Sequence, residues 1–284
     1  MNNISVYGST GFIGSKYCSI FSNHIAIPRE QNEPETNNIL YLVSTIHNYN
    51  VFDDIKMDVE TNLVKLLDVL GQCRAKYDTD FTFNFISSWF VYGQTNDLPA
   101  KETSDCNPKG FYSITKRAAE QLIISYCETF GIKYRILRLC NVYGDYDNKS
   151  SKKRNALQHL IEEVVKGNDI NLYDRGENIR DFLHIEDVCR AIDTCVNSDK
   201  TANSIVNIGS GKATKFIDVM NYVKSKTNSP SNFNFVDPPH FHKVVQVQDM
   251  YLDVSTLRSL GFVESTDIYS GVDKLINTIT EDLQ

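Results

Sequence analysis

Three glycines near the N-terminus limit the possible folds of this chain more than any other feature of its sequence. They stand at positions 8, 11 and 14 in the segment GSTGFIG, which directly follows a short, mostly apolar run at residues 4–6. The first glycine permits a tight turn, the second lets the backbone approach a pyrophosphate, and the third lets a helix pack on a strand. The pattern therefore predicts a strand, a phosphate-binding turn and a helix in direct succession.

The backbone N–H groups of this turn, together with the positive end of the helix, are expected to hold the phosphates of a dinucleotide. The alternative is a tight glycine turn without a ligand, which the spacing and the position after a strand make the weaker interpretation. The residues predicted to bind the cofactor here are Gly8, Ser9, Thr10, Gly11, Phe12, Ile13 and Gly14.

The end of the second predicted strand bears on which dinucleotide is bound. In many NAD enzymes an acidic residue about 20 positions beyond the glycines accepts a hydrogen bond from the adenosine ribose. Here the sequence reads IPRE, and Arg29 can pair with a 2′-phosphate because a guanidinium matches phosphate geometry. The preferred cofactor is therefore NADP(H). NAD(H) stays possible through Glu30 if the register is shifted by one residue, and Arg29 can also be simply solvated.

Short apolar runs alternate with helical patterns through the first two thirds of the chain, which is typical of βαβ units and a parallel sheet. Compact apolar runs predict strands at residues 4–6, 24–27, 39–43, 81–86 and 134–139. Apolar residues at three- and four-residue spacing predict helices at residues 12–21, 59–70, 111–130, 156–166, 185–196 and near 216–226. The predicted fold class is α/β, with a Rossmann-type doubly wound parallel sheet and a smaller C-terminal α/β substrate lobe.

The pattern becomes less regular after about residue 146. We expect a dinucleotide-binding Rossmann domain over residues 1–146, to which segments from about 175–210 return, and a mainly substrate-binding lobe over residues 147–284. The polar run at 147–154 is interpreted as a surface loop, with a lid over a phosphorylated ligand as the alternative.

A second motif carries groups suited to proton transfer. The segment YSITK places Tyr112 and Lys116 four residues apart at the start of a predicted helix, and hence on one face of it. A neighbouring cation favours phenolate, so Lys116 is expected to lower the pKa of Tyr112 and let it exchange a proton with a substrate oxygen as hydride moves. Lys116 is also expected to hold the nicotinamide ribose. Taken alone, the pair is compatible with an ordinary surface helix.

Hydroxyl groups are expected beside this pair. The predicted strand at 81–86 is followed by Ser87 and Ser88, at the carboxyl end of the sheet, where open α/β sheets bind ligands. Ser88 is predicted to hydrogen-bond the reacting oxygen. Ser87 is equally compatible with ending the strand, a common role of serine.

Charge and composition argue against several classes of function. A formal net charge of -7 provides no broad basic surface for nucleic acid. No apolar run approaches the roughly 20 residues that span a bilayer, and no signal-peptide pattern is present, so neither a membrane nor a secreted location is expected. The seven cysteines form no CxxC pair or Cys/His cluster, so no metal site or disulfide framework is predicted. Reduced thiols and a cytoplasmic location are expected.

Together, the motifs resemble those of the extended short-chain dehydrogenase/reductases, a family of nucleotide-sugar epimerases, dehydratases and 4-ketoreductases. The likeness extends over nearly the whole chain and follows the family order. It is carried by GSTGFIG, SSWFVYG, YSITK, RLCNVYG at 138–144, RDFLHIEDV at 180–188 and NIGSG at 207–211.

The resemblance implies a catalytic triad and a site for the substrate. Ser88, Tyr112 and Lys116 would form the triad. Asn141 and Arg180 would contact the nucleotide diphosphate of a nucleotide-linked sugar, and a guanidinium can indeed fork onto a diphosphate.

Other roles are also compatible with some of these positions. Asn141 can be a turn residue, and Arg180 can form an ion pair with Asp181. His184 and Asp187 are interpreted as packing and capping groups.

Three departures from the family pattern narrow the prediction. Related sugar 4,6-dehydratases carry an Asp-Glu pair where this chain has Trp89 and Phe90, and elimination of water is difficult without those carboxyl groups. The segment between residues 27 and 39 is shorter than in the family, which implies the loss of a strand and of an acid that contacts the adenine. Finally, YLVST replaces the common His-Leu-Ala-Ala type of strand ending. The residues then expected near the cofactor ribose are Val43, Ser44 and Thr45.

The leading hypothesis is an NADPH-dependent reductase that converts an NDP-4-keto-6-deoxy sugar to an NDP-deoxyhexose. The compact chain, Arg29 and the missing dehydratase acids favour it. The alternative is an NAD-dependent NDP-sugar C4 epimerase, which would use the same triad to oxidise and re-reduce the sugar. A third hypothesis is a non-catalytic dinucleotide-binding regulator, which the complete triad argues against. The resemblance also implies a homodimer formed through the predicted helices at 59–70 and 111–130.

Overall fold

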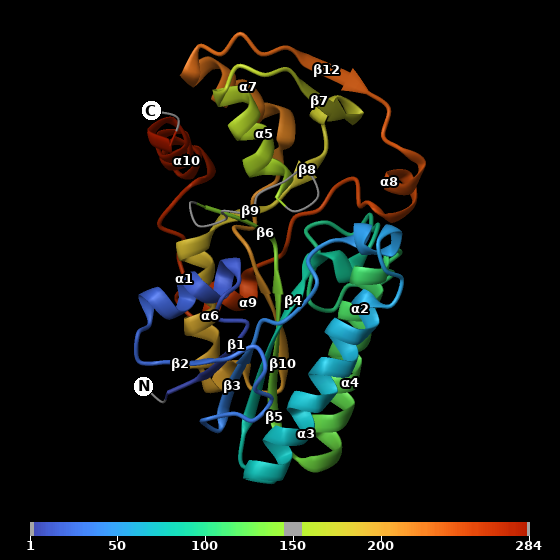
Figure 1. The fold of residues 1–284 in the computed structure, drawn as a ribbon, viewed down its shortest axis with the longest axis vertical. Helices are drawn as coiled ribbons and strands as arrows, with labels where there is room; N and C mark the ends of the chain where they lie inside the picture. The colour runs from blue at the N-terminus through green and yellow to red at the C-terminus, as the bar shows by residue number, and fades with distance from the viewer. Residues whose placement is uncertain (1–2, 145–154, 283–284) are drawn as a thin grey trace.

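The computed structural model of the chain describes residues 3–144 and 155–282, so the polar run at 147–154 lies outside the described residues. Six strands form one parallel sheet in the order β10-β5-β4-β3-β1-β2 (Figure 1). Their bounds are β1 Ser5–Tyr7, β2 Ile25–Ile27, β3 Asn38–Tyr41, β4 Thr82–Ser88, β5 Lys133–Leu139 and β10 Ser204–Ile208. The predicted α/β fold with a parallel sheet is confirmed.

The carboxyl ends of three neighbouring strands meet where the glycine segment begins. Tyr7, the last residue of β1, pairs with Ile27 of β2 and with Tyr41 of β3. β2 is the outermost strand of the sheet, and no strand is assigned to residues 28–37, which lead back to β3. The short segment noted in the sequence therefore forms a loop at the edge of the sheet.

Helices cover both faces of the sheet (Figure 1). On one face, α1 (Phe12–Ile20) and α6 (Ile185–Val196) share an apolar core with the sheet. On the other face, α3 (Lys65–Tyr77) and α4 (Phe111–Phe130) share a second core. Because both faces are covered, the strands are buried on both sides, as the compact apolar runs in the sequence predict.

One helix differs from its predicted bounds. The helical segment predicted at 59–70 starts earlier, with α2 (Met57–Val59), passes through a π-helical turn, η2 (Glu60–Val64), and continues as α3 to Tyr77. The apolar repeat fades after Leu70, since only Cys73 is buried in the rest of α3, and the sequence pattern therefore underestimates the length.

A smaller lobe contains three pairs of short strands, β6 with β9, β7 with β12 and β8 with β11, and a third core formed mainly by α5, α7 and α10. The bounds are β6 Asn141–Tyr143, β7 Ile170–Tyr173, β8 Ile179–Arg180, β9 Phe182–His184, β11 Thr214–Lys215, β12 Phe233–Val236, α5 Ala156–Val165, α7 Phe216–Thr227, α8 His240–Val245, α9 Ser255–Ser259 and α10 Ile268–Asp282. Of the segment at 175–210, α6 and β10 accompany the large sheet, whereas β8 and β9 pair within the smaller lobe. The division into a cofactor domain and a substrate lobe stays our proposal.

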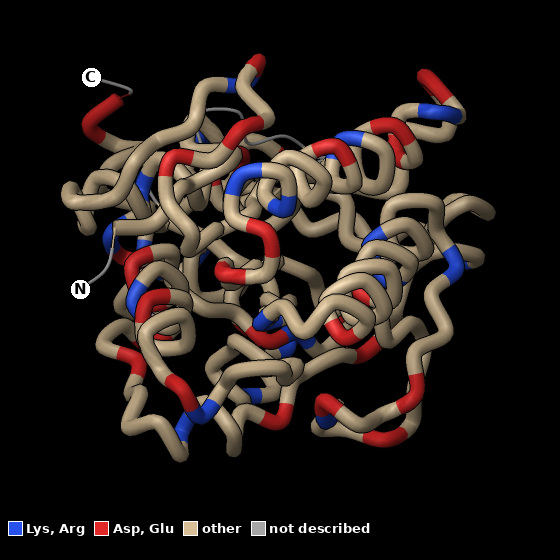
Figure 2. Tube along the Cα trace, turned by 90° about the horizontal axis from the view of Figure 1, so that it is seen from below, with Lys and Arg blue, Asp and Glu red and all other residues tan. Residues whose placement is uncertain are grey.

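None of the helices in residues 3–144 and 155–282 combines the length and apolar content that a bilayer-spanning segment needs. Acidic and basic positions are interspersed along the described trace instead of forming one basic stripe (Figure 2).

Candidate active site

The glycine segment forms the turn that the sequence predicts. Gly8 has a φ of +82°, and its carbonyl oxygen accepts a hydrogen bond of 3.0 Å from the Gly11 N–H. A Cβ atom at Gly14 would lie 2.2 Å from that same carbonyl oxygen, so only glycine lets α1 pack this closely on the turn. Since α1 begins at Phe12, its first N–H groups are available to an anion at this end of the helix.

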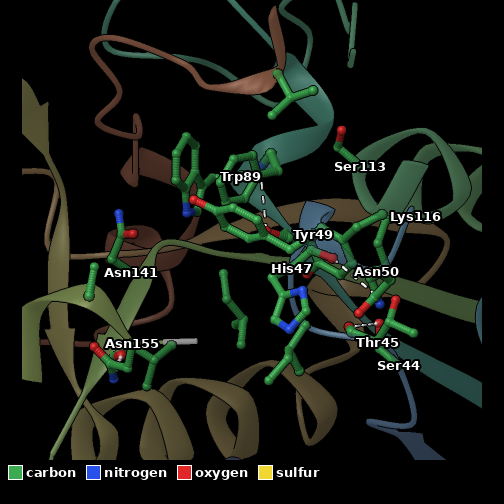
Figure 3. A pocket seen from close by; sticks show the side chains of 18 of the residues that line it. Ser44, Thr45, His47, Tyr49, Asn50, Trp89, Ser113, Lys116, Asn141 and Asn155 are labelled. Carbon is green, nitrogen blue, oxygen red and sulfur yellow. Dashed lines mark hydrogen bonds between the residues drawn. The ribbon is translucent and has the colours of Figure 1, made fainter. Parts of the chain in front are cut away.

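A cavity of about 2520 Å³ extends from this turn past the end of β4 and into the smaller lobe. Figure 3 shows part of its lining, with Lys116 and Asn141 among the labelled side chains. A pocket for one small ligand usually has roughly 300–1,000 Å³, so this cavity has room for a dinucleotide and a second ligand. It is lined by every residue that the sequence predicts to bind or react: Gly8, Ser9, Thr10, Gly11, Phe12, Ile13, Gly14, Arg29, Val43, Ser44, Thr45, Ser88, Tyr112, Lys116, Asn141 and Arg180.

Ser88 and Tyr112 come together in this cavity. Ser88 is the last residue of β4, Tyr112 lies in the first turn of α4, and each residue is only 8% exposed. Burial raises the pKa of Tyr112 to about 12, and the hydrogen bond with Ser88 only partly opposes this rise. Tyr112 is therefore a protonated phenol at neutral pH, which can act as an acid towards a substrate oxygen.

Lys116 does not lower the pKa of Tyr112 in this structure, so that expectation from the sequence is wrong. Its side-chain nitrogen donates to the Ile86 carbonyl oxygen at 2.5 Å and lies 4.1 Å from the centre of the Phe85 ring. Burial lowers the pKa of Lys116 to about 7, while the Glu120 carboxylate, one turn further along α4, acts in the opposite direction. Lys116 thus contacts β4, and burial is the main cause of the raised pKa of Tyr112.

This buried lysine predicts a pH dependence of stability. The pKa of Lys116 is about 7 in the folded chain and about 10.4 in an unfolded one, so between these values the unfolded chain binds one more proton. The contribution of Lys116 to the free energy of unfolding should therefore rise between about pH 7 and about pH 9.5. Urea unfolding of Lys116→Met at both pH values should show the loss of this rise relative to wild type. The same rise in both proteins would contradict a buried neutral amine.

The start of α4 is fixed by a residue that the sequence analysis missed. Asn48, at the start of the short 3-10 helix η1 (Asn48–Phe52), accepts a hydrogen bond of 3.3 Å from the Ser113 N–H through its side-chain oxygen. A Cβ atom at Gly110 would lie 2.0 Å from the same oxygen, so glycine is required for this approach. Asn48 and Ser113 are 65 residues apart, and no local pattern could have identified the contact.

A second asparagine that the sequence did not identify joins the loop after β3 to α4. The buried Asn62 donates to the hydroxyls of Thr45 at 2.8 Å and Thr115 at 2.9 Å. Ser44 in turn donates to the Asn62 side-chain oxygen at 3.0 Å, and Thr45 donates to Asp58 at 2.5 Å. The two hydroxyls expected near the cofactor ribose are therefore already hydrogen-bonded within the protein, although both residues line the cavity (Figure 3).

Arg180 reaches the cavity, and no carboxylate in residues 3–144 and 155–282 forms an ion pair with it, although Asp249 and Asp174 lie near enough to favour its charge. It donates to the carbonyl oxygens of Gln248 at 2.5 Å and Val247 at 2.9 Å, and its guanidinium carbon lies 5.5 Å from the centre of the Trp89 ring. Burial lowers the pKa of Arg180 to about 10, which still leaves it cationic at neutral pH. A cation whose hydrogen bonds go only to carbonyl oxygens is suited to receive an anion.

The other roles considered for Asn141 and Arg180 are wrong. Asp181 does not pair with Arg180, because its carboxylate accepts hydrogen bonds of 2.9–3.3 Å from three backbone N–H groups, those of Ser210, Gly211 and Leu252. Asn141 is the first residue of β6 and not a turn residue, and its amide nitrogen donates to the Asp181 carbonyl oxygen at 3.1 Å.

The interpretation of His184 and Asp187 is confirmed. His184 is the N-cap of α6 and accepts a hydrogen bond of 3.4 Å from the Glu186 N–H. The buried Asp187 accepts hydrogen bonds from the N–H groups of Ser265 and Thr266, and thereby attaches the C-terminal segment to α6.

Two aromatic side chains lie beside the hydroxyls of Ser88 and Tyr112. Trp89 and Phe90 follow Ser88 in the 3-10 helix η3 (Trp89–Tyr92), and their ring centroids are stacked 4.0 Å apart. The Phe90 ring meets the Tyr112 ring edge-on at 6.1 Å. Both aromatic residues line the cavity.

The parallel sheet, the glycine turn and the assembled Ser88, Tyr112 and Lys116 define a dinucleotide-dependent enzyme of the extended short-chain dehydrogenase/reductase type. Residues 39–209 match the model of the NAD dependent epimerase/dehydratase family. The match covers more than half of the chain, and the chain belongs to this family.

Two relatives illustrate the range of activities in the family. The chain is 28% identical over 239 residues to a Methanocaldococcus jannaschii protein provisionally named UDP-glucose 4-epimerase, which covers 84% of this chain and 75% of that protein. It is 27% identical over 258 residues to RHM3 of Arabidopsis thaliana, named trifunctional UDP-glucose 4,6-dehydratase/UDP-4-keto-6-deoxy-D-glucose 3,5-epimerase/UDP-4-keto-L-rhamnose-reductase. That match covers 87% of this chain and 36% of the plant protein. The chain therefore spans about a third of the plant relative.

Solved structures with lower sequence identity share the fold over the full length. UDP-glucose 4-epimerase from Thermotoga maritima, solved with UDP-glucose, has a TM-score of 0.88 at 21% identity, with 100% of both chains covered. RMD from Pseudomonas aeruginosa, solved with NADPH, has a TM-score of 0.85 at 18% identity, with 99% of this chain and 100% of that chain covered. At such identities the likeness establishes the fold.

Proposed function

We propose that the protein is an NADPH-dependent reductase that converts an NDP-4-keto-6-deoxy sugar to an NDP-deoxyhexose. The observation that carries this proposal is the protonated phenol of Tyr112, next to the Ser88 hydroxyl, in a cavity with room for a dinucleotide and a second ligand. Reduction of a ketone needs a proton donor at its oxygen, and the Tyr112 hydroxyl, which is protonated at neutral pH, can supply the proton.

The residues present fit a dinucleotide. The glycine turn leaves the N–H groups at the start of α1 open to a pyrophosphate, and Arg29 lines the cavity just beyond β2, whereas Glu30 does not. Bound here, NADPH would supply the hydride that reduces the carbonyl carbon. Lys116 would hold the nicotinamide ribose once its amine leaves the Ile86 carbonyl oxygen, and Val43, Ser44 and Thr45 would contact the cofactor where they line the cavity.

The proton in the proposed reaction comes from Tyr112. Its O–H bond breaks, and the proton moves to the carbonyl oxygen as the carbon gains hydride, so that the C=O group becomes CH–OH and Tyr112 becomes a tyrosinate. The Ser88 hydroxyl hydrogen-bonds the same oxygen and holds it in place. A proton from solvent then restores Tyr112, whose pKa of about 12 strongly favours the protonated form.

The nucleotide diphosphate of the substrate would bind Arg180 and Asn141. Arg180 is cationic and has carbonyl oxygens and an aromatic ring as its partners, so it can exchange these for diphosphate oxygens. Asn141 presents an amide on the neighbouring strand β6 and lines the same cavity.

The aromatic side chains of Trp89 and Phe90 support a deoxy sugar. A sugar whose keto oxygen meets Ser88 and Tyr112 has neighbouring substituents close to Phe90, whose ring adjoins Tyr112. Burying a hydroxyl against such a ring without a hydrogen bond costs about 1–3 kcal/mol, whereas a methyl group has no such cost. Trp89 and Phe90 occupy the positions of the Asp-Glu pair expected of a dehydratase. The lack of these two carboxyl groups also argues against elimination of water.

A second candidate function is that of an NDP-sugar C4 epimerase with tightly held NAD. The same Ser88, Tyr112 and Lys116 would oxidise and re-reduce the sugar. The M. jannaschii relative, provisionally named as such an epimerase, favours this candidate. An epimerase shows no net consumption of cofactor, which separates it from a reductase.

We also propose that the enzyme is a homodimer in the cytoplasm. Large apolar side chains are exposed on the helical face formed by η2, α3 and α4, among them those of Val64, Leu67, Ile114 and Leu122. An exposed apolar face of this kind is typical of a protein interface. All seven cysteines are free, which suits a reducing compartment.

The proposed function is tested by incubating the enzyme with NADPH, and separately with NADH, and a panel of nucleotide-linked 4-keto-6-deoxy sugars. We expect stoichiometric loss of NADPH with one reduced sugar, identified by NMR. Matched sugars that carry a 6-hydroxyl group should react more slowly. Interconversion of unreduced nucleotide sugars by enzyme that carries bound NAD would replace the reductase with the epimerase.

A further inference from the structure

The end of the cavity beyond β2 holds two cationic side chains from distant parts of the chain. Arg29 follows β2 by two residues, and Lys65 is the first residue of α3; both line the cavity. The side-chain nitrogen of Lys65 lies 3.4 Å from the Arg29 carbonyl oxygen and 2.5 Å from the Asn32 side-chain oxygen. The helix therefore brings a second positive charge to the loop that carries Arg29.

This loop is fixed in position. The Tyr7 hydroxyl donates to the Asn32 carbonyl oxygen at 2.7 Å, which ties the loop to β1 beside the glycine turn. Lys65 holds the same loop from the helix side through Arg29 and Asn32. Arg29 is thereby kept close to the place where the adenosine ribose of a dinucleotide lies when its pyrophosphate is on the glycine turn.

The two cations have no carboxylate partner in residues 3–144 and 155–282, since neither takes part in an ion pair there. Two of the three acids of the loop are engaged elsewhere: Glu33 pairs with Lys76 at 2.9 Å, and Glu35 accepts a hydrogen bond of 2.8 Å from Gln31. The third, Glu30, does not line the cavity. Lys65 is only half-buried, and its present partners are two neutral oxygens. A phosphate dianion offers both cations a stronger partner than either has now.

We propose that Lys65 is a specificity-determining residue that binds the 2′-phosphate of NADP(H) together with Arg29. The inference rests on the proposed use of NADP(H) and assigns a second ligand to the phosphate. A ribose with a free 2′-hydroxyl gains little from two cations, so the pair discriminates against NAD(H). Lys65 also keeps the Arg29 loop in place when no cofactor is bound.

The test is the dissociation constant of NADPH and of NADH, measured by fluorescence without any sugar, for wild type and for Lys65→Met. We expect Lys65→Met to weaken NADPH binding about 10- to 100-fold, since one charge-assisted contact is lost, and to change NADH binding less than about threefold. Competition by 2′,5′-ADP should weaken in the same way, and competition by 5′-ADP should not. Lys65→Arg should retain most of the preference for NADPH.

Lys76→Met is the matched control. Lys76 lies on the same helix and also donates to a carbonyl oxygen of this loop, that of Pro34, at 2.8 Å, but it does not line the cavity. Its replacement should leave both cofactor affinities within about twofold of wild type. Equal weakening of NADPH and NADH in Lys65→Met, or equal weakening of NADPH in both variants, would overturn the assignment. A wild type that binds NADPH through Lys65 but reduces no nucleotide sugar would disprove the proposed reaction and leave this inference standing.

Discussion

Replacing Tyr112 by Phe is expected to lower kcat by about 10²- to 10⁴-fold, the usual contribution of a positioned acid. The ring and its edge-on contact with Phe90 are kept, so the affinity for NADPH and the free energy of unfolding should change little. The substitution removes only the hydroxyl that would protonate the carbonyl oxygen of the substrate. The measurement is the steady-state rate of NADPH oxidation with the sugar identified in the panel, together with cofactor affinity.

Tyr126→Phe is the control for this prediction. Tyr126 lies on the same helix, packs its ring 4.9 Å from that of Phe130, and does not line the cavity. It should retain wild-type turnover. If Tyr112→Phe were as active as wild type, Tyr112 would have no part in the chemistry. A wild-type chain that binds NADPH yet turns over no nucleotide sugar would favour the non-catalytic dinucleotide-binding regulator.

The second large effect is expected in stability, from Arg138→Leu. Arg138 is 1% exposed and Glu120 is fully buried, and the two form a bidentate pair with bonds of 3.0 and 2.8 Å between β5 and α4. Removing the arginine leaves a buried carboxylate without its main partner. Loss of one member of such a pair costs about 3–5 kcal/mol in the free energy of unfolding, which urea unfolding at neutral pH would measure.

Arg117→Leu provides the comparison, because Arg117 contacts the same carboxylate at 2.8 Å but is partly exposed. Solvent screens this contact, and its loss should cost about 0–1 kcal/mol. The double variant Arg138→Leu/Glu120→Leu should recover much of the stability, since no buried charge remains. Similar losses for Arg138→Leu and Arg117→Leu would show that burial does not govern this cluster.

The parts of the fold that depend on local pattern were predictable from the sequence. The strand–turn–helix at the N-terminus follows from glycine spacing, and α4 was predicted with its observed bounds, because its apolar repeat is continuous and Gly131 ends it with a φ of +70°. Helix α3 was predicted too short, because residues after Leu70 contribute little to the core.

The candidate site was predictable as a set of residues but not as a set of contacts. Spacing on one helix face places Tyr112 near Lys116, but it does not reveal that the lysine donates to a strand carbonyl and leaves the pKa of the phenol to burial. Asn48 and Asn62 act on residues more than fifteen positions away, through contacts that only the tertiary structure creates. The sequence did not identify Lys65 for the same reason, because its contacts with Arg29 and Asn32 exist only in the tertiary structure.

The missing strand beyond β2 has a consequence for how long the cofactor stays bound. With a loop in place of a further strand, the adenosine half of a dinucleotide would lie at the outermost strand of the sheet and, in the proposed binding mode, would rely on charged side chains that solvent can reach. Contacts of this kind break readily, which shortens residence time. A reductase must release the oxidised dinucleotide in every catalytic cycle. An epimerase regenerates its dinucleotide within the cycle, so it is favoured by a cofactor that stays bound. The open edge therefore suits a dinucleotide used as a co-substrate.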